Sequence, residues 1–416
     1  MRSITDFAPE IQSKLWDFGK KLRLSEMTRP ERKNTIHLLW GMLKSRTAHV
    51  SVISRALEED ITPKKTTERL NRTLRKDGYW RRLTGENLRQ NCREIRKRRF
   101  CVIDVSDIQK PRAEVMEGVA EVYDGDISKG GEPVTGRGYW WLTGMLIDRD
   151  GCLPVYSEIY SLEWERTGEN AKIVDAIQTV RTVHSEAIVV LDRGGDRRTI
   201  INQLITWNAG FIIRGRDQRH LGLHHDSGTK TLIGDIARRT RVKRPYRSIR
   251  TGARFTVGIR RVYLDGHPLW LVVARRGEAL SWYLTNVAGS RPHIMDTVME
   301  GYGCRWSIEE FHRQVKQEYS LEAIRLQRYE AIKSMGALIM VAVSFCTRLS
   351  QGLAINLVAA AGLLERLKYK DLPRFMLYMI TKAVAAAIAA SAKRPQKPLR
   401  IRKRNYFQYA LPLPGI

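Results

Sequence analysis

The sequence predicts an α/β fold in which a mixed sheet forms the core, a β-rich segment interrupts that core, and helices occupy both ends of the chain. Strand-like and helix-like patterns alternate between residues 100 and 216, which is typical of a sheet with helices on its faces. The first 95 residues show helix patterns with few strand-like runs. With 416 residues, the chain has room for two or three domains.

Three short helices are expected in the N-terminal region, at Glu31 to Lys44, Val50 to Glu58 and Thr66 to Lys76. The third, TTERLNRTLRK, combines a threonine cap with basic side chains, which suits a helix that lies against DNA. The alternative is the solvated face of a helical bundle.

The core begins with the β-rich run Phe100 to Val105, and Asp104 is expected near the end of that strand. Two further strand-like runs, Tyr139 to Ile147 and Leu153 to Leu162, are joined by a short polar turn that predicts a hairpin. Three strands connected in this way form the antiparallel part of the predicted sheet.

The second half of the core alternates helix and strand. A helix from Glu169 to His184 precedes the continuous apolar run Ala187 to Leu191, which Asp192 and a Gly-Gly pair terminate. A helix from Arg197 to Trp207 and the strand Phe211 to Arg214 follow. Asp192 is therefore expected at a strand end, like Asp104.

About 75 residues separate Arg214 from the next long helix, too many for a simple loop, so we expect an inserted β-rich subdomain. Arg238 to Arg261 contains ten Lys or Arg residues, no acid, and the aromatics Tyr246 and Phe255. Such a surface can bind phosphates and stack on exposed bases.

The segment YGCRWSIEEFHRQVK carries the most informative pattern. Tyr302, Arg305, Glu309 and Lys316 stand at offsets of 0, 3, 7 and 14, which fall on one face of a helix, and Arg313 is expected to join them. The opposite face is apolar and consists of Cys304, Ile308, Phe311 and Val315. One carboxylate thus stands in a row of phosphate-binding side chains. An amphipathic helix with a solvated charged face is the alternative.

Asp104, Asp192 and Glu309 together offer three hard oxygen donors, which suit Mg²⁺ or Mn²⁺ better than zinc. Two such ions about 3.5–4 Å apart can stabilise the attacking and the leaving oxygen of an in-line phosphoryl displacement. Either aspartate alone could equally be a turn former or a helix cap. The combination predicts metal-dependent phosphodiester chemistry.

These residues resemble the DDE transposases of bacterial insertion sequences, in the group called insertion sequence family 4, which the pattern Y-x2-R-x3-E-x6-K defines. Tyr302, Arg305, Glu309 and Lys316 match it without a gap. The stretch DVSDI matches the surroundings of the family's first aspartate, with Asp104 the first choice and Asp107 the fallback, and Asp192 opens the D-R-x-x-D stretch. The resemblance covers residues 100 to 345.

The resemblance implies an RNase H-like core, which the predicted order of strands and helices satisfies. It implies two Mg²⁺ ions per active site, with Mn²⁺ as a substitute, held by the three carboxylates. It also implies cut-and-paste movement of double-stranded DNA: cleavage at the inverted repeats, hairpin formation on the transposon end, and insertion into target DNA by a homodimer.

The resemblance further assigns DNA contacts. Its DNA-binding positions correspond to Tyr302, Arg305, Lys316, Arg214 and Arg313. The family holds a flipped base on a tryptophan of the insertion, and Trp282 is the candidate. Ser281 occupies the matching position, however, so alternation along the strand would turn Trp282 to the other face unless a bulge intervenes. Burial of Trp282 in the core is the alternative.

The expected organisation has five parts. These are a helical DNA-binding domain (1–95), the first part of the core (96–216), the basic insertion (217–290), the second part of the core (291–345), and C-terminal helices with a basic tail (346–416).

Composition supports a nucleic-acid partner. The chain has 72 Lys+Arg against 44 Asp+Glu, a formal charge of +28, which points to a polyanion. The longest apolar runs, at 335–346 and 383–392, are too short to span a membrane, so no membrane partner is expected. Five cysteines without a C-x-x-C pair favour a reducing cytoplasm. The resemblance implies that this cytoplasm is bacterial and that the protein is associated with the nucleoid through DNA.

Two other functions remain open from the sequence. An RNase H-like nuclease that cuts without joining would use the same metal chemistry. A DNA-binding repressor with an inactive core would need only the basic surfaces.

Overall fold

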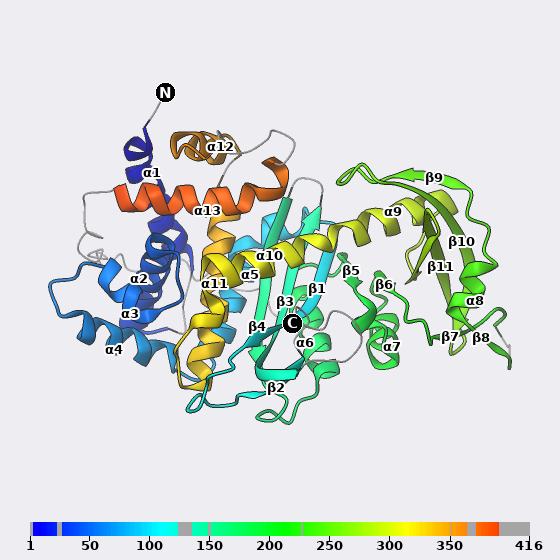
Figure 1. Ribbon diagram of the computed structural model, residues 1–416, viewed down its shortest axis with the longest axis horizontal. Coiled ribbons are helices and arrows are strands. Elements are labelled where there is room, and N and C mark those ends of the chain that lie inside the picture. Colours follow the sequence, from blue (N-terminus) through cyan, green and yellow to red (C-terminus); the bar gives the residue numbers. More distant parts are fainter. Residues whose placement is uncertain are drawn as a thin grey trace, which may run out of the picture.

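The computed structural model describes residues 3–22, 27–123, 135–148, 151–225, 228–349, 351–363 and 372–390. Within them the chain forms a mixed sheet of twelve strands with helices on both faces (Figure 1). The predicted α/β class is therefore confirmed.

Five strands form the centre of this sheet, in the spatial order β4-β3-β1-β5-β6. They are β1 (Phe100–Gln109), β3 (Thr135–Asp148), β4 (Gly151–Tyr160), β5 (Ile188–Leu191) and β6 (Phe211–Arg214). β4, β3 and β1 are antiparallel neighbours, whereas β1, β5 and β6 run parallel. Three hairpin-type strands followed by two parallel strands are the arrangement expected of an RNase H-like core.

Strand β1 is longer than the sequence indicated. It continues four residues past Val105, to Gln109, because β3 pairs with it along its whole length. Asp104 pairs with Thr143 in the middle of the strand, so its expected place near the strand end is wrong. Asp192, in contrast, directly follows β5 as expected.

The residues after β6 extend the same sheet instead of leaving it. They form β7 (His220–Gly222), β8 (Lys230–Leu232), α8 (Ile233–Arg238), β9 (Arg244–Arg247), β10 (Arg254–Leu264), β11 (His267–Arg276) and β12 (Ala279–Thr285). β12 pairs antiparallel with β6, and β11 and β10 follow it outward. The insertion is therefore β-rich, and the central sheet continues into it. At the opposite edge of the sheet, β2 (Ala120–Tyr123) pairs with β3.

Helices cover both faces of the central strands. α6 (Glu169–Arg181) and α7 (Arg198–Thr206) pack on one face, together with Cys101 of β1. α9 (Arg291–Cys304) and α10 (Trp306–Glu318) pack on the other, together with Phe100. The expected apolar stripe of Cys304, Ile308, Phe311 and Val315 is buried, which confirms that prediction. The single helix expected over 302–316 is interrupted at Arg305, where α9 ends and α10 begins.

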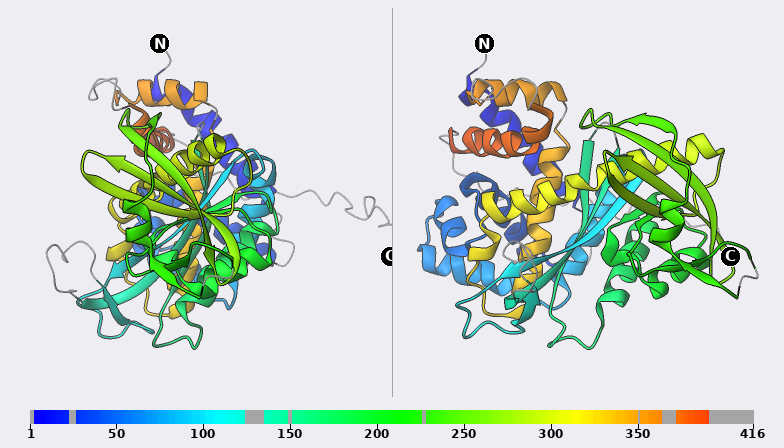
Figure 2. Two further views of the ribbon diagram at one scale, coloured as in Figure 1. Left: turned by 90° about the vertical axis from the view of Figure 1, so that its right-hand side faces the viewer. Right: turned by 45° about the vertical axis from the view of Figure 1, so that its right-hand side comes forward.

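Helices from the two ends of the chain pack together, at the end of the molecule opposite the insertion (Figure 2). The N-terminal ones are α1 (Ile4–Lys21), α2 (Arg29–Ser45), α3 (Val50–Ala56), α4 (Pro63–Leu74) and α5 (Tyr79–Ile95), and the C-terminal ones are α11 (Tyr329–Thr347), α12 (Gln351–Ala360) and α13 (Leu372–Ala390). α11 connects this group to the core, because Gly336 approaches Ile159 of β4 so closely that a Cβ there would lie 2.8 Å from its side chain.

Among the described residues, α11 is the one helix long and apolar enough to cross a membrane, but 89% of its most apolar window is buried inside the protein. Burial of this kind is typical of the core helix of a soluble protein. The predicted basic tail, AKRPQKPLRIRKRNYF at 392–407, lies outside the described residues.

Candidate active site

Strand alternation places the predicted site residues on one face of the sheet. Phe100 and Val102 of β1 pack under α9 and α10, so Asp104, two residues further on, points to the same face. Val190 of β5 and Ile212 of β6 also lie on that face. The same parity directs Asp192 and Arg214 toward α9 and α10. These two helices and the residue between them carry the four residues of the Y-x2-R-x3-E-x6-K pattern, called the signature residues below.

Asp104 is a largely buried carboxylate, with 13% of its side chain exposed. Burial is the main reason that its pKa rises from 3.8 to about 7, and the neighbouring charge of Asp192 adds to the rise, as does that of Glu309. Arg305 opposes the shift, with 3.5 Å between its Nη1 and Asp104 Oδ2. The three carboxylates are therefore electrostatic neighbours.

Asp192 is positioned by the turn that follows β5. Its Oδ1 accepts a hydrogen bond from Gly194 N at 2.7 Å. Gly195 is required next, because a Cβ at that position would lie 2.4 Å from Leu191 Cβ. The Gly-Gly pair thus allows a tight turn that holds the Asp192 carboxylate at the end of the strand.

Asp196 connects this turn to the segment that leads from β6 into the insertion. Its side chain is buried and accepts hydrogen bonds from Arg219 Nε at 2.9 Å and from Arg216 N at 2.6 Å. Arg216 Nε also donates to Arg193 O at 2.9 Å. The turn beside Asp192 is therefore held from both sides by the segment after β6.

Arg305 contacts two of the three carboxylates. Its guanidinium forms an ion pair with Asp104 and a hydrogen-bonded ion pair with Glu309, one helical turn further on. Only 16% of the Arg305 side chain is exposed. The boundary between α9 and α10 falls at this residue, so the guanidinium emerges between the two helices.

The other two signature residues, Tyr302 and Lys316, have different neighbours. The ring of Tyr302 lies 4.6 Å from that of Tyr283 and next to the guanidinium of Arg305, 5.7 Å from its ring centre. Lys316 lies further along α10 and forms ion pairs with Asp107 at 3.4 Å and Glu322 at 3.2 Å. Asp107, the fallback choice, thus pairs with Lys316, whereas Asp104 lies with the other carboxylates.

Two predicted residues are not brought to this cluster. Arg313 pairs with Glu310, at 3.0 Å, on the exposed side of α10, although it was expected on the face of Glu309. Trp282 packs against Gly215 and lies near Gly234, on the face of β12 opposite to Tyr283. Strand alternation is the reason, since the residue on the site face is Tyr283.

Three residues near the site were missed from the sequence. Tyr283 lies beside Tyr302 and Arg214, and burial raises its pKa to about 12. His312 Nε2 lies 2.6 Å from the Thr143 hydroxyl, which in turn donates to Asp104 O at 3.4 Å. Alternation along SWYLTN could have identified Tyr283, but nothing local in the sequence links His312 to Thr143.

The donor set fits a hard divalent cation, since three carboxylates face one region and no soft ligand is among them. Burial first, and then repulsion from the neighbouring carboxylates, raises the pKa of Asp104, and such a cation would relieve the repulsion. Among the described residues, no three His, Cys, Asp or Glu side chains stand close enough to form a finished metal site. Arg305 supplies the positive charge instead, so it would have to release Asp104 and Glu309.

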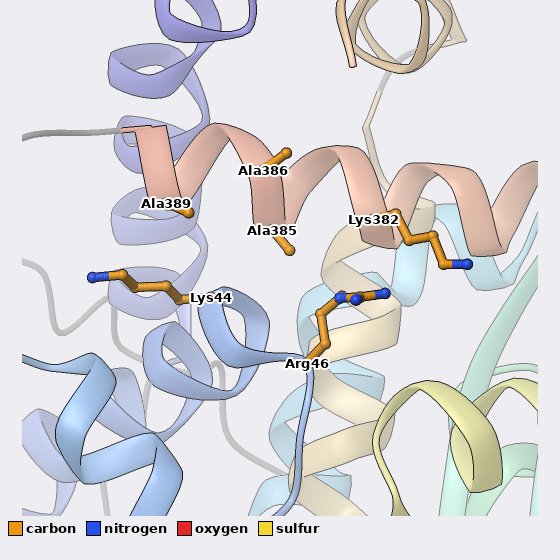
Figure 3. Close-up of a pocket in the computed structure, with 6 residues that line it drawn as sticks. All are labelled: Lys44, Arg46, Lys382, Ala385, Ala386 and Ala389. Atoms are coloured by element: carbon orange, nitrogen blue, oxygen red, sulfur yellow. The ribbon is translucent and has the colours of Figure 1, made fainter. Parts of the chain in front are cut away.

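A separate surface pocket of about 410 Å³ lies between α2 and α13 (Figure 3). Its lining residues are Lys44, Arg46, Lys382, Ala385, Ala386 and Ala389. Arg46 and Lys382 both pair with Glu318, at 2.6 and 3.1 Å, and Lys44 pairs with Glu58. Most of the positive charge is therefore neutralised, and none of the predicted catalytic residues lines this pocket.

Comparison with known proteins identifies the family. A sequence model described as "Transposase DDE domain" matches residues 95–345, more than half of the chain. The cryo-EM structure of a piggyBac transposase synaptic complex with hairpin DNA is similar at 12% sequence identity and a TM-score of 0.42, covering 94% of this chain and 80% of that one. No curated protein sequence matches. The extent of the family match shows that this chain belongs to the DDE transposase domain family.

Proposed function

We propose that this DNA transposase is a cut-and-paste enzyme of the insertion sequence family 4 type, from a bacterium. It would bind the inverted repeats of its own element, cleave there through hairpin ends, and join those ends to target DNA. The observation that carries the proposal is the convergence of Asp104, Asp192 and Glu309 on the face covered by α9 and α10, where Arg305 pairs with both Asp104 and Glu309.

The three carboxylates are the catalytic residues of this proposal. They would hold two Mg²⁺ ions, with Mn²⁺ as a substitute, which when bound activate a water and later a DNA 3′-hydroxyl for in-line attack. Asp104 must then be deprotonated, which burial and the neighbouring carboxylates of Asp192 and Glu309 oppose in the metal-free protein.

The basic and aromatic side chains of the site would position the DNA. Arg305, once it leaves Asp104 and Glu309, presents a planar fork that matches a phosphate. Tyr302 holds that guanidinium in place through its ring. Lys316 and Arg214 would contact neighbouring phosphates, and Arg313 and Trp282 would act farther from the carboxylates.

Regions outside the core would hold the rest of the DNA. We assign residues 1–95 to end binding, 96–216 and 291–345 to the catalytic core, 217–290 to a DNA-gripping insertion, and 346–416 to supporting helices and a tail. The insertion has the matching surface, because Arg261 stacks 4.7 Å from the ring of Trp270, a pair suited to phosphate and base contacts. A homodimer in the cytoplasm, associated with the nucleoid, would bridge both ends.

The test is incubation of the purified protein with duplex DNA carrying the repeats that flank its gene, plus Mg²⁺, followed by a denaturing gel. We expect cleavage at the repeat boundary and a hairpin product. Glu309→Ala should abolish both, because it removes one of the three carboxylates. Glu186→Ala, at an exposed turn between α6 and β5, is the matched control and should cut like the wild type.

Two results would contradict the proposal. Cuts without end specificity and without joining would indicate the nuclease. A gel shift without any cleavage would leave the repressor, a DNA-binding protein with an inactive core.

A further inference from the structure

Lys316, the last of the signature residues, is held between two acids. Its Nζ lies 3.4 Å from Asp107 Oδ1 and 3.2 Å from Glu322 Oε1, and only 16% of its side chain is exposed. Burial opposes the charge on Lys316, but the two carboxylates outweigh burial and raise the pKa of the ammonium. Because two carboxylates share one ammonium, Lys316 has no unmatched positive charge to offer to a phosphate.

This group of three side chains lies next to the candidate catalytic carboxylates. Along β1, Asp107 follows Asp104 by three residues, a rise of about 10 Å. Along α10, Lys316 follows Glu309 by seven residues, which is also a rise of about 10 Å. The strand and the helix therefore lead side by side from the carboxylates to the Lys316 group, so a DNA strand cut at the carboxylates can reach Lys316 with a neighbouring phosphate.

Asp107 is the more firmly held of the two acids. It lies within β1, where it pairs with Trp140 of β3, and 15% of its side chain is exposed. Its Oδ2 accepts a hydrogen bond from Gln109 Nε2 at 2.8 Å, which leaves Oδ1 for Lys316. A carboxylate on a paired strand, with a second partner that fixes its other oxygen, is suited to orienting the ammonium.

Glu322 is the more accessible acid, with 38% of its side chain exposed. It lies on the short 3₁₀ helix Leu321–Ala323 that follows α10. The buried Lys110 holds the backbone there, because its Nζ donates to Glu322 O at 2.5 Å and to Ile324 O at 3.0 Å. The backbone of Glu322 is therefore fixed, whereas its carboxylate is exposed enough to rotate into water and leave its place to another anion.

We propose that Asp107 holds Lys316 in the orientation that contacts a phosphate of the bound DNA, and that Glu322 occupies the place of that phosphate until the DNA arrives. Asp107 is then a positioning residue, and Glu322 is a competitor that the DNA displaces. Such competition favours DNA that is already held by the rest of the site, because an isolated anion must displace Glu322 without that help. This inference rests on the proposed function, which supplies the contact between Lys316 and DNA.

The test compares two variants of the full-length protein, Glu322→Gln and Asp107→Asn, which keep nearly the same shape and each remove one negative charge. Fluorescence anisotropy gives the Kd for a labelled duplex that carries the flanking repeat and its boundary, and EDTA prevents cleavage. We expect Glu322→Gln to lower the Kd several-fold, because the competitor is lost. Asp107→Asn should raise it several-fold, because Lys316 loses its orientation. A general effect of net charge would lower the Kd with both variants.

The variant Lys316→Gln shows whether both effects pass through the ammonium. In that background, Asp107→Asn and Glu322→Gln should no longer shift the Kd in opposite directions, because their shared partner is gone. A merely structural role of Asp107 would persist there. Glu186→Gln, at an exposed turn between α6 and β5, is the matched control and should leave the Kd unchanged.

Thermal melts followed by circular dichroism should show that each variant is folded. The exposed Glu322 tests the competitor even if Asp107→Asn loosens β1. Any pattern other than opposite shifts, while the wild type binds and cuts the repeat, would overturn the exchange at Lys316. Failure of the wild type to bind or cut the repeat would overturn the proposed function itself.

Discussion

At the scale of single residues, the site is defined by a carboxylate in an unfavourable position. Asp104 lies in a buried strand beside two other acids, and its pKa of about 7 reflects burial first and the charge of Asp192 second. Arg305 compensates only part of this cost, at a distance of 3.5 Å from Asp104. Such perturbed groups are typical of functional sites, where function is kept at the expense of stability.

Replacing Asp104 with Asn should stabilise the metal-free protein in a pH-dependent way. A carboxyl whose folded pKa is raised from 3.8 to about 7 contributes stability that is fully present below pH 3.8 and is lost as the pH rises to about 7. Thermal melts in EDTA should therefore show Asp104→Asn above the wild type at pH 8 and close to it at pH 4. The same variant should not cleave DNA. A melting temperature of Asp104→Asn below that of the wild type at pH 8 would show that the ionised Asp104 carboxylate does not destabilise the fold.

At the scale of elements, a contact of His312 links the helix that carries Glu309, through Thr143 of β3, to the strand that carries Asp104. His312 of α10 is buried, with its ring 5.0 Å from that of Trp141, and its Nε2 meets the Thr143 hydroxyl of β3. Burial, with smaller contributions from Lys316 and Arg305, lowers the pKa of His312 to about 3, so the ring is neutral. A neutral, buried histidine is suited to positioning.

Removing this contact should slow cleavage while DNA binding persists. His312→Phe keeps a ring against Trp141 but loses the bond to Thr143, so α10 can shift relative to β1. Thr143→Val should have a similar effect. Because both act through one contact, the double variant should be little worse than either single one, with a coupling energy of about 0.5–3 kcal/mol from single-turnover rates. Additive losses would show that the two residues act separately.

At the scale of the whole molecule, a buried charge network connects three parts of the chain. Glu158 of β4 accepts from Lys172 of α6 at 2.6 Å and from Lys333 of α11 at 3.3 Å. Lys333 also lies 4.6 Å from the ring of Trp80, in α5. The network therefore fixes the core to helices from both ends of the chain. Burial alone would raise the pKa of its other acid, Glu165, but hydrogen bonds from Lys172 and Lys333 hold that pKa at about 2.

Glu158→Ala should destabilise the protein strongly, because it leaves Lys172 and Lys333 buried with only Glu165 as a partner. Breaking a buried ion pair on one side costs about 3–5 kcal/mol. Urea denaturation followed by circular dichroism should show the loss, and Glu278→Ala, which is exposed, should not. If Glu158→Ala lowered the free energy of unfolding by less than about 1 kcal/mol, the loss would be close to that of a surface substitution. The network would then not hold these parts together.

The sequence by itself determined the elements whose cause is local. The continuous apolar run Ala187 to Leu191 identified β5, the apolar stripe identified the buried side of α10, and the Gly-Gly pair placed Asp192 after its strand. The spacing of Tyr302, Arg305 and Glu309 indicated the chemistry, because side-chain spacing on a helix is fixed by its 3.6-residue turn.

Only the tertiary structure decided what depends on distant partners. Pairing with β3 carried β1 past Val105 and put Asp104 in mid-strand, and the parity of β12 turned Trp282 away and Tyr283 toward the site. The contacts of His312 with Thr143 and of Arg305 with Asp104 join residues 169 and 201 positions apart. No local pattern encodes such contacts, because the packing of separate elements creates them.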